Sequence, residues 1–141
     1  MNPLELWATD IISENIPFVQ KGRDRKGIDC WGLICLAYKE VYNLELPHYT
    51  ETYDTTKDFK KLAKTFSKHK DEWVEIEPGK ELEGDCILLN VRNRPIHVGI
   101  ITKKGYMLHI EENIDACVES YKTFQWKNRI VGIYRHPNHS T

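Results

Sequence analysis

Cys30 and two histidines, His97 and His109, are the residues of this sequence whose types and spacing could carry out nucleophilic chemistry. The stretch GIDCWGLICLAYKE, residues 27 to 40, places Cys30 directly after Asp29 and at the head of an apolar run with helical spacing. A thiol in the first turn of a helix meets the positive end of the helix dipole, which favours the thiolate and lowers the thiol pKa. This position predicts that Cys30 is a nucleophile; simple membership of the buried stripe of the helix is the alternative.

The two histidines lie inside apolar β patterns, HVGIIT and YMLHIE, which are separated by Lys-Lys-Gly. This spacing predicts a hairpin with a three-residue loop, residues 103 to 105, and Gly105 in the left-handed conformation. Position 99 would then face 109, and 97 would face 111. His97 and His109 would be diagonal neighbours on one sheet face, about 7 to 8 Å apart at the backbone, so their rings could hydrogen-bond.

A nucleophilic thiolate needs a base, and the paired histidines predict one. One histidine would act as the general base to Cys30, and the second would fix the tautomer and orientation of the first. Glu111, opposite His97 in this register, is an alternative for the orienting role. Gly99, opposite His109, has no side chain and leaves room for the pair.

The other cysteines, Cys35, Cys86 and Cys117, lie within elements or away from any helix start, and we interpret them as reduced thiols. No CxxC pair of the kind that structural zinc sites use is present. The sequence therefore predicts no metal and no cofactor. A zinc site built from cysteines and histidines is disfavoured by these spacings but remains an alternative.

The composition limits the class of protein. A chain of 141 residues is the length of one domain, so we expect a single domain over residues 1–141. The formal net charge of −1, with 29% charged residues, argues against a nucleic-acid partner. No run of eighteen apolar residues exists, which argues against membrane insertion, and the start MNPLELWATDI lacks the basic region of a signal peptide.

Helical patterns come first in the chain and β patterns follow. Asn2, Pro3 and Glu5 predict the start of a first helix, and Asp29 is the natural N-cap of a second, which should have one buried face. A third helical pattern over residues 57 to 68 has a lysine-rich face, which solvent or an anionic polymer could contact. Four β-rich runs follow, at residues 86 to 91, 97 to 102, 106 to 111 and 129 to 134. This order indicates an α+β fold.

These motifs together resemble the NlpC/p-sixty family of papain-like cysteine peptidases, which cut the peptide stems of bacterial cell wall. The match runs from about residue 16 to 112. Its elements are Pro17-Phe18, Gly22, Gly27, Asp29-Cys30-Trp31-Gly32-Leu33, Gly84-Asp85, His97-Val98-Gly99-Ile100 and His109. The resemblance implies a papain-like, NlpC-type fold with N-terminal helices packed on a central antiparallel β-sheet. It also implies a Cys-His-His triad in which Cys30 is the nucleophile, His97 the general base and His109 the residue that orients it.

One position departs from the family. Twelve residues before the nucleophile the family typically has a tyrosine whose hydroxyl helps to hold the oxyanion, and here Phe18 has none. Loss of such a donor costs about 2.7 to 4 kcal/mol of transition-state stabilisation. The backbone N–H of Cys30 at the helix start remains as an oxyanion donor. We expect Cys30, Phe18 and Asp29 to form the oxyanion and substrate-positioning part of the site.

The resemblance implies a cysteine hydrolase of amide bonds in peptidoglycan stem peptides. The form PFVQKGRDRKGIDCWGL looks most like the branch found in tail-tip or tail-assembly proteins of bacteriophages, so other tail-tip proteins are the expected partners. Such a protein would be made in the bacterial cytoplasm without a signal peptide and would act in the cell envelope from the virion tail tip. The alternative is a tail-tip assembly module with the same fold and weak or no catalysis. The enzyme hypothesis predicts that Cys30 is alkylated faster than the other three thiols near pH 6.

Overall fold

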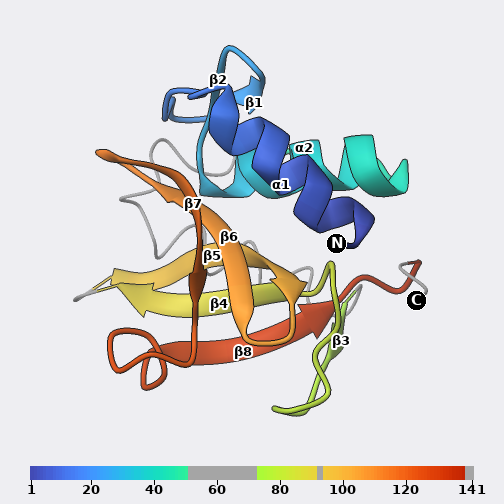
Figure 1. Cartoon of the computed structure of the whole chain (residues 1–141), viewed down its shortest axis with the longest axis vertical. Helices are drawn as coiled ribbons and strands as arrows, with labels where there is room; N and C mark the ends of the chain where they lie inside the picture. Colours follow the sequence, from blue (N-terminus) through green and yellow to red (C-terminus); the bar gives the residue numbers. More distant parts are fainter. Residues whose placement is uncertain (51–72, 92–93, 139–141) are drawn as a thin grey trace.

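Two helices lie on one face of a six-stranded antiparallel sheet (Figure 1), in a computed structural model that describes residues 1–50, 73–91 and 94–138. The helices are α1 (Pro3–Ser13) and α2 (Cys30–Tyr42). The sheet has the order β3-β8-β4-β5-β6-β7, with β3 (Val74–Glu75), β4 (Cys86–Val91), β5 (Arg94–Lys103), β6 (Tyr106–Glu111), β7 (Ile114–Ser120) and β8 (Ile130–Arg135). A small hairpin, β1 (Arg23–Asp24) and β2 (Gly27–Ile28), precedes α2. The predicted α+β fold with an antiparallel sheet is confirmed.

Helix α1 begins where the sequence predicted. The Asn2 side chain accepts the backbone N–H of Glu5 at 2.8 Å, and the Glu5 carboxylate accepts the backbone N–H of Asn2 at 3.1 Å, which forms a capping box. Leu4, Ala8 and Ile11 are buried and face α2 and the sheet. The local sequence therefore sets both the start and the buried face of this helix.

Helix α2 differs from the prediction of one buried face. Every residue from Cys30 to Tyr38 is buried, because α1 and the hairpin β1–β2 cover the helix where the sheet does not. A helix that is apolar on all sides is typical of the centre of a domain. The described part of the chain is thus organised around α2, and the position of the first turn of this helix is fixed by contacts from several elements.

The four predicted β runs all form strands, whereas the two-residue strands β1, β2 and β3 and the longer strand β7 were not predicted. Strands β4 and β6 have the predicted bounds, and β5 and β8 contain nearly all of the predicted runs. Strand β7 was missed because its exposed side chains alternate weakly and give no strong β signal. The helical pattern at residues 57 to 68 lies outside the described residues. Among those described, no helix is long and apolar enough to cross a bilayer.

The hairpin between β5 and β6 is tighter than predicted. Lys103 pairs with Tyr106, so the loop has two residues, and an irregularity in the pairing lies between Ile101 and Lys103. Gly105 has a φ of +97°, as expected for the left-handed position. The ladder runs in the predicted register, and its last paired residues are Ile100 and Leu108.

Hydrophobic side chains fill both faces of the sheet. The face toward the helices carries the first cluster, to which Val98 and Ile100 of β5 belong. The opposite face carries a second cluster, Ile87, Leu89, Ile101, Met107, Tyr121, Trp126 and Ile133. The segment between β7 and β8 supplies Tyr121 and Trp126 and thus covers this second face.

Candidate active site

The carboxylate of Asp29 fixes the N-terminus of α2 and is fully buried. Its Oδ1 accepts the backbone N–H of Gly32 and the guanidinium of Arg23, both at 2.8 Å, and its Oδ2 accepts the backbone N–H of Lys21 at 2.9 Å. One side chain therefore caps the helix and ties it to the preceding turn. Asp29 was predicted to position substrate; in the structure it holds the turn that carries Cys30.

Glycines let the hairpin β1–β2 lie directly on this turn. A Cβ on Gly32 would lie 2.0 Å from the carbonyl oxygen of Gly22, and a Cβ on Gly22 would lie 2.2 Å from that of Gly27. The two glycines and five charges of residues 20 to 27 alone would predict an exposed loop. The segment forms a hairpin instead, because these close backbone contacts bring it against α2.

The thiol of Cys30 is buried beside the backbone of β5, and its side chain is in the first hydrophobic cluster. Burial raises the pKa of the thiol to about 12, and the negative charge of Asp29 adds to the rise. Hydrogen bonds from the backbone of Val98 and Trp31 favour the thiolate but are outweighed. The predicted lowering of the Cys30 pKa by the helix dipole is therefore wrong: desolvation is the larger effect, and the resting group is a neutral thiol.

His97 and His109 are joined by a hydrogen bond of 2.8 Å between Nε2 of the first and Nδ1 of the second. Both rings are buried, with 3% and 2% of each residue exposed. Burial, with the nearby His109, lowers the pKa of His97 to about 3, so this imidazole is neutral. The bond to His109 occupies Nε2 of His97 and leaves Nδ1 as the nitrogen that can accept a proton.

The neighbour of His97 in the chain, Val98, is the residue whose backbone bonds to the Cys30 thiol. The structure thus places the thiol beside the backbone of the strand that carries the first histidine, whose imidazole projects from the other face of that strand onto Trp126. Among the described residues, no direct hydrogen bond joins the thiol to the imidazole of His97. Such contacts are often long before substrate binds and tighten in the reacting complex.

Two positions of the site were missed by the sequence. Nε2 of His109 bonds to the carboxylate of Glu119 at 2.9 Å, and the indole N–H of Trp126 donates to the other oxygen of that carboxylate. The Trp126 ring stacks on His97 and meets His109 edge-on. Glu119 lies on strand β7, which was not predicted, and Trp126 lies in the segment that follows this strand.

The alternative orienting residue, Glu111, is farther from His97 than His109 is. Its Oε1 lies 3.7 Å from Nε2 of His97, against 2.8 Å for Nδ1 of His109. Gly99 does leave the predicted room, since a Cβ there would lie 3.4 Å from Cβ of His109. The geometry favours the histidine as the partner of His97.

Phe18 lies beside the start of α2, as the motif predicted. It forms a parallel bridge with Ile28, two residues before Cys30, and packs half-buried against the first hydrophobic cluster. The backbone N–H of Val19 donates to Ile28 at 3.0 Å, and that of Ile28 donates to Pro17 at 3.1 Å. The backbone of Phe18 is thus held beside the strand that leads into α2, and its ring brings no hydrogen-bond donor.

Residues 46–49 form a second neighbour of the helix start. The carbonyl of Pro47 accepts the indole N–H of Trp31 at 2.8 Å, and the carbonyl of His48 accepts the guanidinium of Arg23 at 2.6 Å. The ring of Tyr49 stacks on that of Trp31, with centroids 5.7 Å apart. This segment is therefore attached to the same turn that carries Cys30.

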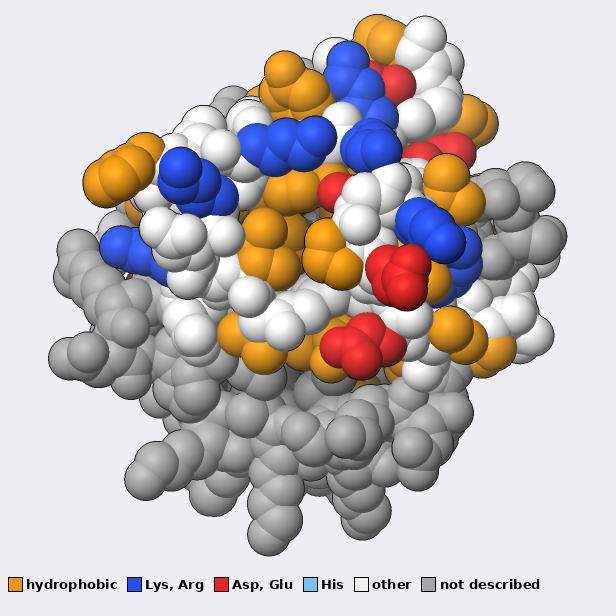
Figure 2. Space-filling model, turned by 90° about the horizontal axis from the view of Figure 1, so that it is seen from below, with side chains coloured by type: hydrophobic (Ala, Val, Ile, Leu, Met, Phe, Trp, Pro, Cys, Tyr) orange, Lys and Arg blue, Asp and Glu red, His pale blue; other side chains and the backbone are white. Residues whose placement is uncertain are grey.

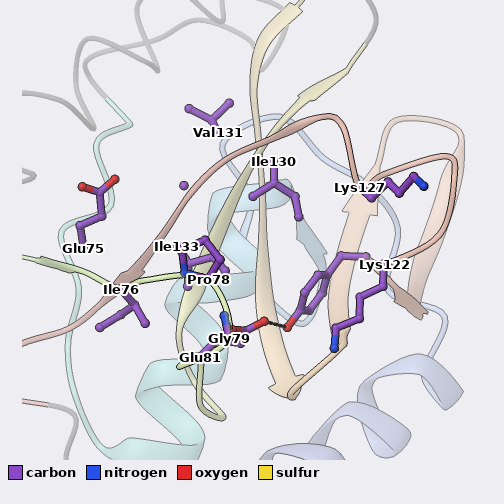
Figure 3. Close-up of a pocket in the computed structure, with 12 residues that line it drawn as sticks. Glu75, Ile76, Pro78, Gly79, Glu81, Lys122, Lys127, Ile130, Val131 and Ile133 are labelled. Carbon is purple, nitrogen blue, oxygen red and sulfur yellow. Dashed lines mark hydrogen bonds between the residues drawn. The ribbon is translucent and has the colours of Figure 1, made fainter.

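A cavity of about 520 Å³ lies elsewhere, on the sheet face away from the helices (Figure 3). Ile76, Pro78 and Ile130 line it, and at its floor the Tyr121 hydroxyl donates to Glu81 at 2.6 Å. Figure 2, which looks from below, shows hydrophobic side chains gathered in the described part of that side of the molecule, with Lys and Arg side chains above them and most of the Asp and Glu side chains to their right. Neither Cys30 nor the histidine pair lines this cavity.

Comparisons with known proteins agree with this arrangement. A family model described as NlpC/P60 family matches residues 15–135. A curated relative, murein DD-endopeptidase MepS/murein LD-carboxypeptidase of Escherichia coli (strain K12), is 25% identical over 108 residues, which are 77% of this chain and 49% of the relative. The chain thus spans about half the length of the curated relatives it matches.

Solved structures share the fold. The NlpC/p60 domain of the peptidoglycan hydrolase SagA is 18% identical with a TM-score of 0.61, and the match covers 94% of this chain and 97% of that domain. A lipoprotein-like NLP/P60 family protein from Staphylococcus aureus subsp. aureus Mu50 has a TM-score of 0.66 at 18% identity, over 99% of this chain and 43% of that one. At these identities the likeness establishes the architecture.

Proposed function

This chain belongs to the NlpC/P60 family, and from that premise and the geometry of its site we propose that it is a cysteine peptidase that hydrolyses amide bonds in peptidoglycan stem peptides. The observation that carries the proposal is the buried hydrogen bond between His97 and His109, directly beside the strand backbone that contacts the Cys30 thiol. The relative from Escherichia coli is named as a murein peptidase, which supports this substrate class.

The proton positions follow from the hydrogen bonds. Glu119 is an acceptor only, so His109 donates its Nε2–H to that carboxylate and its Nδ1 accepts from Nε2–H of His97. Nδ1 of His97 is then unprotonated and is the base. The buried row of two imidazoles and one carboxylate selects this tautomer, which is the role of the third member of a triad.

The reaction uses that nitrogen twice. Nδ1 of His97 takes the thiol proton as the Cys30 sulfur attacks the carbonyl carbon, and a tetrahedral oxyanion forms. Collapse breaks the C–N bond, the leaving amine takes the proton from Nδ1, and a thioester remains. Water, giving a proton to the same nitrogen, then releases the acid product and restores the thiol. Since the resting thiol is neutral, the proton transfer belongs to the attack step.

The oxyanion site is smaller than a tyrosine-containing one. The backbone N–H of Cys30, at the first position of α2, points out of the helix and is free to bind the oxyanion. Phe18 adds none, and one missing donor costs about 2.7 to 4 kcal/mol. We therefore expect slow turnover. The same residue favours a second candidate function, a tail-tip assembly module that keeps the fold with weak or no catalysis.

We also propose that the protein works at a bacteriophage tail tip, docked to other tail proteins and acting in the cell envelope. The support is the sequence form PFVQKGRDRKGIDCWGL around the nucleophile. Mass spectrometry of purified virions tests this role. The chain should be found in tail preparations in a fixed ratio to other tail proteins, and its absence from washed particles would contradict it.

Digestion of purified peptidoglycan tests the activity. The wild-type protein should release stem-peptide fragments that mass spectrometry identifies by the new amine and carboxyl ends, and Cys30→Ala should release none. Cys35→Ala is the matched control, because Cys35 is a buried thiol of the same helix. A folded wild-type protein without any product at high enzyme concentration would support the assembly module instead.

A further inference from the structure

We propose that His109, Cys117 and Glu119 form a zinc site whose occupation switches off the neighbouring base, His97. The three side chains come from paired strands, since Cys117 lies directly opposite His109 and Glu119 follows two residues later on β7. The spacing of cysteines and histidines in the sequence argued against a metal site. Spacing motifs, however, detect only ligands that are close to one another along the chain. These ligands are brought together by cross-strand pairing.

The distances between the ligand atoms suit zinc. Nε2 of His109 lies 3.7 Å from the Cys117 sulfur and 2.9 Å from Oε2 of Glu119, and that sulfur lies 3.5 Å from the same oxygen. Zinc bonds of about 2.0 to 2.3 Å at tetrahedral angles require ligand atoms about 3.3 to 3.6 Å apart. Only the His109–Glu119 contact has to open, by a few tenths of an ångström.

The ligand set and its surroundings fit the same metal. Zinc accepts imidazole, thiolate and carboxylate together, and three protein ligands leave a fourth position for water. Cys117 and Glu119 are partly exposed, so an ion can reach them, whereas His109 is buried and fixed. Nδ1 of His109 bonds to His97 at 2.8 Å, which supplies the hydrogen bond that metal-bound histidines usually make. Trp126 holds the Glu119 carboxylate from the other side.

Occupation of this site would reverse the hydrogen bond between the histidines. A neutral imidazole has one N–H, and zinc on Nε2 of His109 leaves that proton on Nδ1. Nδ1 then donates to Nε2 of His97, whose own proton must lie on Nδ1. His97 can no longer accept the thiol proton. Each imidazole still holds one proton, and the proton of the Cys117 thiol is released. The loss of the base at His97 rests on the proposed function, whereas zinc binding itself does not.

Binding is tested in Cys30→Ala, which cannot use the nucleophile as a ligand. Titration with Co²⁺, a spectroscopic substitute for zinc, should show one ion per chain and a thiolate-to-cobalt absorption. Cys117→Ala in the same background should lose that absorption and bind at least about tenfold more weakly, by comparison with the 10- to 100-fold loss seen for outer-shell residues. Cys35→Ala in this background should bind as Cys30→Ala does. Equal binding with and without Cys117, or no binding at all, would overturn the proposal.

Inhibition is measured on peptidoglycan digestion after removal of metal with a chelator. Zinc at one equivalent should suppress the wild-type rate, and Cys117→Ala should keep most of its own metal-free rate at the same concentration. Zinc that inhibits both variants equally contradicts the switch. If cobalt binds through Cys117 and no variant shows peptidase activity, the proposed function fails while the metal site stands.

Discussion

The indole of Trp126 stacks on the imidazole of His97, with 6.2 Å between the ring centroids and 25° between the planes. The same indole donates its N–H to Glu119, the carboxylate that binds His109. One side chain therefore contacts all three members of the row that sets the tautomer of the base. The segment between β7 and β8 is thus part of the site, although it carries none of the reacting atoms.

Replacement of this indole should lower activity more than stability explains. Trp126→Phe keeps a ring against His97 but removes the donor to Glu119, so we expect a loss of about 1.5 to 3 kcal/mol in unfolding free energy and a lower kcat. Trp7→Phe is the matched control, because the Trp7 indole donates to Glu40 at 2.9 Å on the exposed side of α1. Urea unfolding and digestion rates measure the two effects. An unchanged kcat in folded Trp126→Phe contradicts the positioning role.

Alkylation of Cys30 should be slow at neutral pH and should accelerate with alkali. Because burial raises its pKa to about 12, the thiolate fraction grows about tenfold per pH unit through the range from 6 to 9. Cys117, whose pKa is about 11 and which is only half-buried, should react first, which reverses the order that the sequence predicted for a preformed Cys30 thiolate. Peptide mapping after timed iodoacetamide treatment follows each thiol. An alkylation rate of Cys30 that does not increase with pH above pH 6 would show that the thiolate is already formed and would contradict the raised pKa.

The neutral imidazole of His97 should make the protein sensitive to acid. Its pKa is about 3 in the folded protein against an ordinary 6.5, so between these values the unfolded chain binds one proton more. Stability is therefore lost as the pH falls through this range, by up to about 1.4 kcal/mol per unit from this group.

Urea unfolding at several pH values measures that slope. His97→Gln should show a shallower fall between pH 6 and 4 than the wild type. His48→Gln, a change at an exposed histidine, should keep the wild-type slope. Parallel curves for His97→Gln and the wild type would contradict the depressed pKa.

Loss of the Asp29 carboxylate should be costly. Asp29→Ala removes the cap of α2 and breaks the buried ion pair with Arg23, which costs about 3 to 5 kcal/mol. Asp24→Ala removes an exposed carboxylate that accepts only a backbone N–H, from Lys26 at 2.9 Å, and should change stability little. The urea concentrations at the midpoints of unfolding of Asp29→Ala and Asp24→Ala measure the two effects. Equal midpoints would show that the Asp29 contacts contribute nothing.

Local signals in the sequence were sufficient to predict much of the fold and part of the candidate site. Asn2 and Asp29 cap their helices through side chains that are only three residues from their partners, so the pattern alone located both starts. The histidine pair was also predictable, because a short hairpin sets the register of His97 against His109. Each of these features depends on neighbours that are close in the chain.

Features that depend on the assembled protein were not predictable. The pKa of Cys30 is set by burial under several elements, and this outweighs the helix dipole that the sequence displays. Glu119 and Trp126 reach the histidines only because β7 pairs with β6 and the following segment folds under the sheet. Single polar residues in a weakly alternating strand carry no local mark of such a role.

Residues 46–49 are anchored to the turn that carries Cys30, so we expect a ligand that approaches the nucleophile to contact this segment. Arg23, Trp31 and the ring of Tyr49 hold this segment before any ligand arrives, so its conformational entropy is already lost on folding. A peptide that contacts this segment meets a surface whose shape is already fixed. The segment therefore discriminates between peptides by how well their shapes fit it. Discrimination between stem peptides would then appear in dissociation rates, with no slow rearrangement of this segment before the encounter.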